Sequence, residues 1–269
     1  MGWVPRGACQ ALTQPIGARY LGLGTYSTRF VDVYATRNNP AALAQLTQTA
    51  VALYAERRFL QDDLNLYTGS LGMPVGNGAF ALHGSYFGFN LQNQTQLQLA
   101  YGRKLGTKVD VGAAFDYRGL NQASIYGNTR VLTGSVGLML HLSPKISAGL
   151  YAYNPIRAAW SKSEQQERLP SRYTLGMGYD ASEKFFMSAE LEHEEGANLN
   201  VNAGFQYRLL PQFFVRAGIA TLTTNYFVGI GMELSGFRLD VATSYHPQLG
   251  LSPGLLLLTN FGKKTTPTP

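Results

Sequence analysis

The sequence has little of what marks an ordinary soluble enzyme or a helical membrane protein. Charged residues make up 14% of the 269 residues, against about 25% in a typical soluble domain. The only cysteine is Cys9, which excludes an intramolecular disulfide framework. The leucine run at 255–258 is four residues long, whereas a membrane-spanning helix needs about 20 apolar residues. A disulfide-stapled domain and a helical membrane protein are therefore excluded.

Enzyme and cofactor motifs are missing as well. The chain contains no G-x-S-x-G, no G-x-G-x-x-G and no P-loop. No two of its four histidines lie at metal-ligand spacing. His193 stands beside Glu192, Glu194 and Glu195, which we interpret as a solvated acidic strand end in preference to a cation site. We expect no enzyme, no cofactor and no metal, and only a Ser/His/Asp triad assembled by the fold stays open.

The net charge of +6 does not point to nucleic acid. Lysines and arginines are scattered singly, and no run exceeds two residues. Anionic headgroups of a membrane surface are a simpler reason for the excess of positive charge. We expect outer-membrane lipid and lipopolysaccharide as partners, and no nucleic acid.

Glycine and aromatic residues are abundant, with 30 Gly, 16 Tyr and 14 Phe, and from Ala50 onward hydropathy alternates with a period of two. In 198–209, one face carries Leu, Val, Ala, Phe, Tyr and Leu, and the other carries Asn, Asn, Asn, Gly, Gln and Arg. Successive side chains of a strand point to opposite faces. This segment therefore predicts a strand that is apolar on one side and polar on the other. Its twelve residues exceed the approximately 9–11 that a strand needs to cross a membrane.

Fourteen such segments can be counted, at 50–59, 63–74, 78–89, 93–104, 109–121, 129–142, 146–153, 171–180, 185–193, 197–209, 213–221, 225–234, 237–245 and 253–262. Short turns such as Gly76-Asn77-Gly78 and Ser235-Gly236 alternate with longer connections, the longest at 154–172. This rhythm is typical of outer-membrane barrels. A soluble β-sandwich is the alternative, but its strands are usually only about 5–6 residues long. We predict an all-β, transmembrane antiparallel β-barrel of about 14 strands with a small N-terminal plug.

The predicted organisation has four parts. Residues 1–11 are interpreted as the remnant of a signal peptide, because Cys9-Gln10-Ala11 places small residues at both ends of a cleavage-like triplet. Residues 12–49 form an N-terminal hatch, 50–262 the transmembrane barrel and 263–269 a disordered tail. We expect the chain in the bacterial outer membrane with both termini in the periplasm.

Two motifs carry a resemblance to a known family. The segment from Gly17 to Gly24, GARYLGLG, and the later Asn39-Pro40-Ala41 resemble the N-terminal hatch of FadL-like outer-membrane proteins. The closest resemblance is to the PorV/PorQ group of Bacteroidetes, which is associated with type IX protein secretion. The segment 244–250, SYHPQLG, is similar to the last hairpin of that group. The resemblance implies a fourteen-stranded barrel that is filled by the hatch.

Two functions follow as hypotheses. The first is a non-enzymatic accessory or shuttle component of a protein secretion or outer-membrane assembly machine, with other envelope proteins as partners. The second is a FadL-like transporter of small hydrophobic molecules. A transporter needs an apolar pocket in the lumen. The inward face expected from the alternation is mostly Asn, Gln, Asp, Glu, Arg and Gly, so the sequence favours the first function.

Three sets of residues are candidates for function. Asn39, Pro40 and Ala41 form the hatch motif, which is either a structural turn opening a short helix or a part of the hatch that contacts a ligand. The loop residues Arg157, Trp160, Lys162 and Arg168 are expected to contact a partner or lipid headgroups. Phe261 is expected to be the aromatic residue of the barrel-closing strand, at the periplasmic edge of the membrane.

Overall fold

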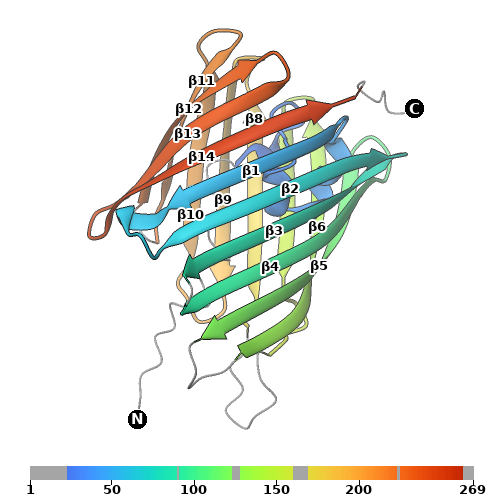
Figure 1. Cartoon of the computed structure of the whole chain (residues 1–269). Helices are drawn as coiled ribbons and strands as arrows, with labels where there is room; N and C mark the ends of the chain where they lie inside the picture. Colours follow the sequence, from blue (N-terminus) through green and yellow to red (C-terminus); the bar gives the residue numbers. More distant parts are fainter. Residues whose placement is uncertain (1–22, 90, 123–127, 160–168, 223–224, 263–269) are drawn as a thin grey trace.

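The computed structural model describes residues 23–89, 91–122, 128–159, 169–222 and 225–262. Its architecture is a closed barrel of fourteen antiparallel strands, each paired with its neighbours in sequence (Figure 1). The strands are β1 (Thr49–Arg57), β2 (Asn65–Val75), β3 (Gly78–Phe89), β4 (Gln92–Lys104), β5 (Val109–Gln122), β6 (Asn128–Ser143), β7 (Ile146–Tyr153), β8 (Arg172–Asp180), β9 (Phe185–Glu194), β10 (Asn200–Arg208), β11 (Phe213–Ala220), β12 (Asn225–Leu234), β13 (Phe237–His246) and β14 (Gly250–Phe261). The predicted fold class and strand number are confirmed.

The barrel closes between its last and first strands. Register runs from Thr49 opposite Phe261 to Glu56 opposite Gly254. The first strand ends at Arg57, earlier than the sequence predicts, because a 3-10 turn, η4 (Arg58–Leu60), follows with Phe59 at a φ of 54°. The last strand begins at Gly250, earlier than expected, so that it also pairs fully with β13.

The outer face of the barrel is apolar. Side chains of alternate residues stand exposed around the wall, among them Leu99 at 55%, Phe115 at 58% and Val241 at 55%. A continuous apolar band of this kind is stable in the hydrocarbon of a membrane and not in water. Among the described residues, no helix has the length and apolar character to cross a membrane.

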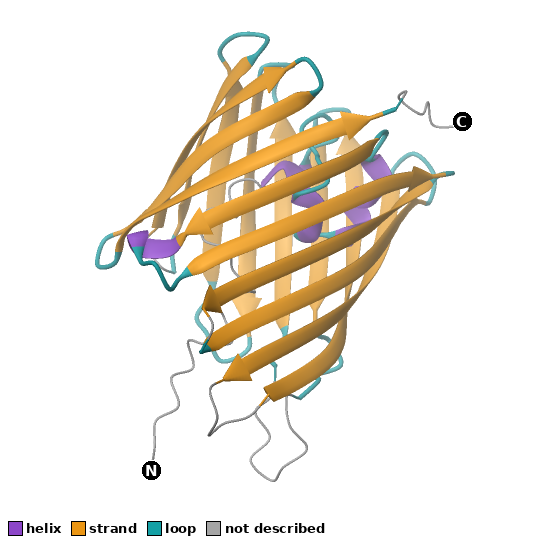
Figure 2. Cartoon of the chain, viewed as in Figure 1, coloured by secondary structure: helices purple, strands orange, loops and turns teal. Residues whose placement is uncertain are grey.

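The described part of the N-terminal segment lies inside the barrel. It contains three short 3-10 helices, η1 (Leu23–Tyr26), η2 (Ala35–Arg37) and η3 (Pro40–Gln45). Figure 2 shows them within the ring of strands, in the half that lies toward the short turns and the end of β14. The predicted hatch spans 12–49; its described part before β1 is residues 23–48, and the word hatch refers to these residues from here on.

The boundaries expected at residues 11 and 262 adjoin segments outside the described residues. Residues 1–22 and 263–269 are among those that the structure does not describe, so the signal-peptide remnant and the disordered tail stay predictions.

A charge on the outer face should destabilise the barrel. Phe115→Arg places a cation in the apolar band of β5, where Phe115 is 58% exposed, and such a charge near the membrane midplane costs about 2–4 kcal/mol. Urea unfolding in lipid vesicles, followed by heat-modifiable gel migration, measures the loss. The control Thr107→Arg, in the exposed turn between β4 and β5, should leave the unfolding midpoint unchanged. Equal midpoints for both variants would contradict the membrane assignment of this face.

Candidate functional site: the lumen and its hatch

The hatch lies close to the barrel wall because glycines face it. A Cβ added at Gly102, Gly112 or Gly137 would overlap the backbone or side chains of 39–44. On the far side of the lumen, a Cβ at Gly176 or Gly178 would overlap Tyr26. The inward glycines that the sequence shows are therefore the surface against which the hatch packs.

Asn39 fixes the hatch motif to the wall. Its Oδ1 accepts a hydrogen bond from the amide of Ala41 at 3.0 Å, which caps η3. Its Nδ2 donates to the carbonyl oxygens of Leu138 at 3.3 Å and Leu150 at 3.1 Å, on β6 and β7. Pro40 follows at the first helical position, where its missing N–H costs nothing. The motif is a helix start anchored to two strands, and a contact with a ligand stays a prediction.

Polar side chains fasten the hatch around the whole circumference. The Tyr26 hydroxyl donates to Glu190 on β9 at 2.9 Å, and the Ser27 hydroxyl donates to Asp180 on β8 at 2.6 Å. Burial, and then the charge of Glu190, raises the pKa of the Tyr26 hydroxyl well above its ordinary value. Tyr26 therefore stays a donor at any physiological pH.

Ion pairs continue this attachment along β11 and β13. Arg238 of β13 donates to Asp32 of the hatch at 2.6 Å and lies 3.2 Å from Asp240. Arg216 of β11 pairs with the same Asp240 at 2.9 Å. These inward charges of opposite sign pair with one another, which avoids the high cost of an unpaired buried charge.

The end of η3 is held by a cluster that sequence reasoning did not find. Gln45 Nε2 donates to Asp110 Oδ2 at 2.5 Å, and His141 Nε2 lies 2.7 Å from the same oxygen. His141 Nδ1 is 3.1 Å from the Ser147 hydroxyl. The cluster borders a cavity of about 710 Å³ that Lys104 also lines, whereas Ser147 does not line it. Through Gln45 the cluster joins the end of η3 to β5 and β6.

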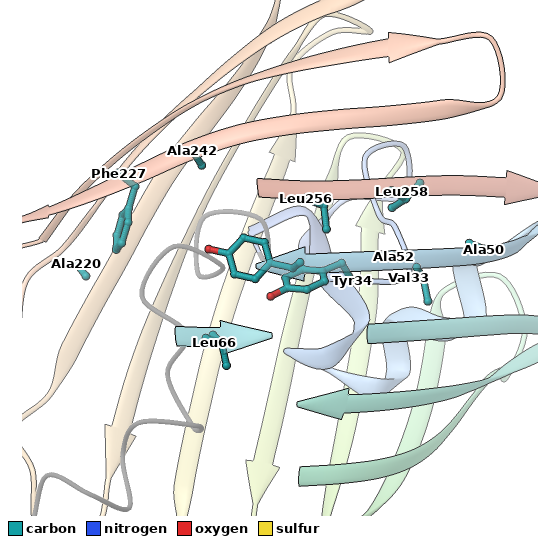
Figure 3. Close-up of a cluster of buried hydrophobic side chains, with 11 residues drawn as sticks. Val33, Tyr34, Ala50, Ala52, Leu66, Ala220, Phe227, Ala242, Leu256 and Leu258 are labelled. Carbon is teal, nitrogen blue, oxygen red and sulfur yellow. The ribbon is translucent and has the colours of Figure 1, made fainter. Parts of the chain in front are cut away.

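Buried polar side chains are numerous on the inward face, as the alternation predicts, but the lumen also holds an apolar patch. Tyr34 of the hatch belongs to one buried apolar cluster with Tyr54, Leu66, Phe227 and Leu256, and these inward side chains are 1–3% exposed or fully buried. Figure 3 shows Tyr34 of the hatch between Leu66 and Leu256, and Phe227 farther along the wall beside Ala220 and Ala242. We call these five residues the lumen patch. The signal for it was present in 255–258, since four consecutive leucines must place two on the inward face.

Two of the remaining candidate residues, Arg157 and Phe261, lie within the described part of the chain. Arg157 is exposed in the connection after β7 and lies 3.5 Å from Glu195. Trp160, Lys162 and Arg168 lie outside the described residues. Phe261 ends β14 opposite Thr49 and is 52% exposed. The roles expected of these residues stay predictions.

His193 does not belong to a metal site in the part of the chain that the structure describes. It pairs across strands with Tyr173 and stands on the outer face of β9. No group of three or more His, Cys, Asp or Glu side chains among the described residues is placed to hold a metal ion.

Comparison with solved structures decides the fold family. The chain is similar to the CymD monoaromatic hydrocarbon channel, with a TM-score of 0.65 and 13% identity over 92% of this chain and 98% of that one. The fold is that of the FadL-type outer-membrane barrels. A Pseudomonas aeruginosa FadL homologue matches with a TM-score of 0.63 and 13% identity, covering 88% of this chain and 96% of that one. The Ralstonia pickettii toluene transporter TbuX matches at 0.59 and 13%, covering 86% and 94%.

Other comparisons give no match. No protein-family model matches the chain, and no curated protein matches it significantly. Of the matching structures, CymD is a monoaromatic hydrocarbon channel and TbuX a toluene transporter. They overturn the preference for a secretion accessory: that prediction is wrong, because it depended on a lumen without an apolar lining and the lumen patch supplies one.

Asn39 offers a test of the anchoring of the hatch. Asn39→Ala removes the cap and both bonds to the wall, and should destabilise the hatch locally by about 1–2 kcal/mol. Asn39→Asp keeps the cap but places a carboxylate against the carbonyls of Leu138 and Leu150, so it should loosen the hatch further. Hydrogen exchange of peptides from 23–48 in detergent measures both. If the peptides of Asn39→Asp are as well protected from exchange as those of the unmodified chain, the bonds from Asn39 to the wall do not stabilise the hatch.

The glycine surface gives a second test. Gly137→Val should displace the hatch, because the new side chain overlaps Asn39 and Pro40, and should raise ion conductance in planar bilayers. The control is Gly84→Val on β3, where a Cβ meets nothing within 4 Å; its conductance should stay at the unmodified level. A Gly137→Val channel that conducts no more than the Gly84→Val channel would contradict a hatch that closes the lumen.

Proposed function

We propose that this protein is an outer-membrane channel for small hydrophobic molecules, of the FadL-like kind. The observation that carries the proposal is the lumen patch, an apolar surface inside the barrel between the hatch and the strand ends that bear the longer loops. An apolar molecule in that position is shielded from water on one side by the hatch and on the others by the wall. An apolar surface in the lumen suits a hydrophobic cargo, whereas a water-filled pore for hydrophilic solutes has a polar interior.

The resemblance in fold to hydrocarbon channels supports the same function. The apolar outer band supports a place in the outer membrane, where lipid and lipopolysaccharide would surround the wall. We further propose that the short turns and both termini face the periplasm, since short periplasmic turns and longer outer loops are usual for such barrels. A closer relation to the PorV/PorQ group stays a prediction from the sequence motifs.

Uptake of radiolabelled toluene tests the transport function. Cells that lack a hydrocarbon channel should accumulate toluene faster when they carry this chain than when they carry an empty vector. Phe227→Gln makes the lumen patch polar and should lower the initial rate several-fold. The matched control is Tyr226→Gln, the next residue on β12, whose side chain is 49% exposed on the outer face; its rate should equal that of the unmodified chain. Heat-modifiable migration checks that both variants assemble. Equal uptake with and without the chain would overturn the proposal.

A further inference from the structure

One corner of the lumen contains polar groups that lack partners among the described residues. The Tyr34 hydroxyl, Arg37 Nη1, the Thr68 hydroxyl and His83 Nε2 are all shielded from solvent, and among the described residues Arg37 Nη1 and His83 Nε2 make no hydrogen bond. The Tyr34 and Thr68 hydroxyls have only each other as a side-chain partner there. Two of these residues belong to the hatch, one to β2 and one to β3. A buried donor that lacks an acceptor is energetically costly, so a concentration of such donors indicates a missing acceptor.

The four groups lie close together. Arg37 Nη2 donates to the Ser85 hydroxyl at 2.8 Å, and Thr68 is the cross-strand partner of Ser85. His83 is the next inward residue of β3, and its Nδ1 lies 2.8 Å from the Ser70 hydroxyl. The Arg37 guanidinium lies 5.7 Å from the centre of the Tyr34 ring. We call Tyr34, Arg37, Thr68 and His83 the hatch corner.

The hatch corner is rich in donors and carries one positive charge. Burial raises the pKa of the Tyr34 hydroxyl to about 12, so this group donates. Thr68 can donate its hydroxyl proton. Nε2 of His83 carries a proton when Ser70 donates to Nδ1. Arg37 Nη1 has N–H groups that point to no acceptor among the described residues.

Nearby carboxylates are engaged elsewhere. Asp32 pairs with Arg238 at 2.6 Å, and Glu56 pairs with Arg58 at 3.1 Å. Among the described residues, Arg37 forms no ion pair, in contrast to Arg216 and Arg238, which each contact Asp240. A shielded guanidinium beside three further donors matches the needs of a planar oxyanion, because arginine binds carboxylates through two parallel hydrogen bonds.

The apolar surroundings indicate what the anion is attached to. Tyr34 belongs both to the hatch corner and to the lumen patch, and its ring lies 5.4 Å from the ring of Tyr54 in a tilted arrangement. Aromatic rings favour further rings in offset or tilted contact. A ligand with its anion at Arg37 would therefore place its apolar part against aromatic side chains.

We propose that the hatch corner binds the carboxylate of an aromatic acid, with the aromatic ring in the lumen patch. This inference rests on the proposed function and narrows it: the cargo is an amphipathic aromatic carboxylate and not a neutral hydrocarbon alone. Arg37 is then the residue that selects for the acid group. Because Arg37 belongs to the hatch, a bound acid would contact the hatch directly.

Calorimetric binding of benzoate and of benzamide to the purified protein in detergent tests the proposal. The two probes have nearly the same shape, and only benzoate is charged. The unmodified protein should bind benzoate at least about tenfold more tightly, which is the lower end expected of hydrogen bonds to a charged group. Arg37→Gln should abolish this preference, and Arg37→Lys should restore part of it. Equal affinities for the two probes, or a preference that survives Arg37→Gln, would overturn the proposal.

Two further variants separate binding from structure. Arg29→Gln removes a hatch arginine whose side chain is 49% exposed and faces Glu183; the preference for benzoate should persist. Thr68→Val removes a hydroxyl whose only side-chain partner among the described residues is the Tyr34 hydroxyl, so it should change the unfolding midpoint little while weakening benzoate binding several-fold. If Thr68→Val binds benzoate as tightly as the unmodified protein, the hatch corner is not the site.

A third probe, decanoate, tests the aromatic part of the proposal. Decanoate should bind more weakly than benzoate; tighter binding that depends on Arg37 would overturn the aromatic assignment. The toluene experiment stands apart from these measurements. Toluene uptake without a benzoate preference would retain the channel and reject the hatch corner as an acid site. A benzoate preference without toluene uptake would support the site and reject the channel for neutral molecules.

Discussion

The structure depends on the need to pair every backbone N–H and C=O group inside a membrane. An open sheet would expose two edges to lipid, where no water is present to satisfy them. Pairing of β14 with β1, from Thr49 opposite Phe261 onward, removes both edges. This closure also turns a period-two sequence into a cylinder with an apolar outer wall and a separate interior. The hatch and the lumen patch exist only because that interior exists.

The hatch can lie inside the barrel only where inward side chains leave room for it. Side chains of opposite strands must not collide with the hatch, and glycines at 102, 112 and 137 let its backbone approach the wall. Attachment points are spread over strands β3, β5, β8, β9 and β13. Because the bonds come from opposite sides of the barrel, no single one determines the position of the hatch. This arrangement suits a segment that keeps a fixed position inside the barrel.

The two sides of the hatch differ in how well their polar groups are satisfied. Toward β8 and β9, Tyr26 and Ser27 each have an acidic partner. Toward β2 and β3, groups of the hatch corner lack partners within the described chain. Apolar side chains of the lumen patch adjoin this second side. A surface that combines a shielded cation with aromatic rings is chemically suited to an amphipathic anion. The side toward β8 and β9, where the polar groups have hydrogen-bond partners, is suited to holding the hatch in place.

The sequence by itself determined the barrel. Two local properties of the sequence predict it without any knowledge of packing: the alternation in segments such as 198–209, and the succession of short and long connections. Strand number followed from counting, and the short helix at Asn39-Pro40-Ala41 followed from the turn and cap preferences of these residues.

Only the tertiary structure decided what the interior contains. Alternation tells which residues share a face, but not which strands stand opposite one another across the lumen. Tyr34 and Leu256 are 222 positions apart and meet only after closure. The leucine run at 255–258 shows that two leucines face inward, but the hatch residue that meets Leu256 there cannot be derived from the run. Likewise, Arg37 looks like any other scattered arginine in the sequence; its lack of a charged partner within the described chain is a property of the fold, because ion pairing depends on distances that no local pattern encodes.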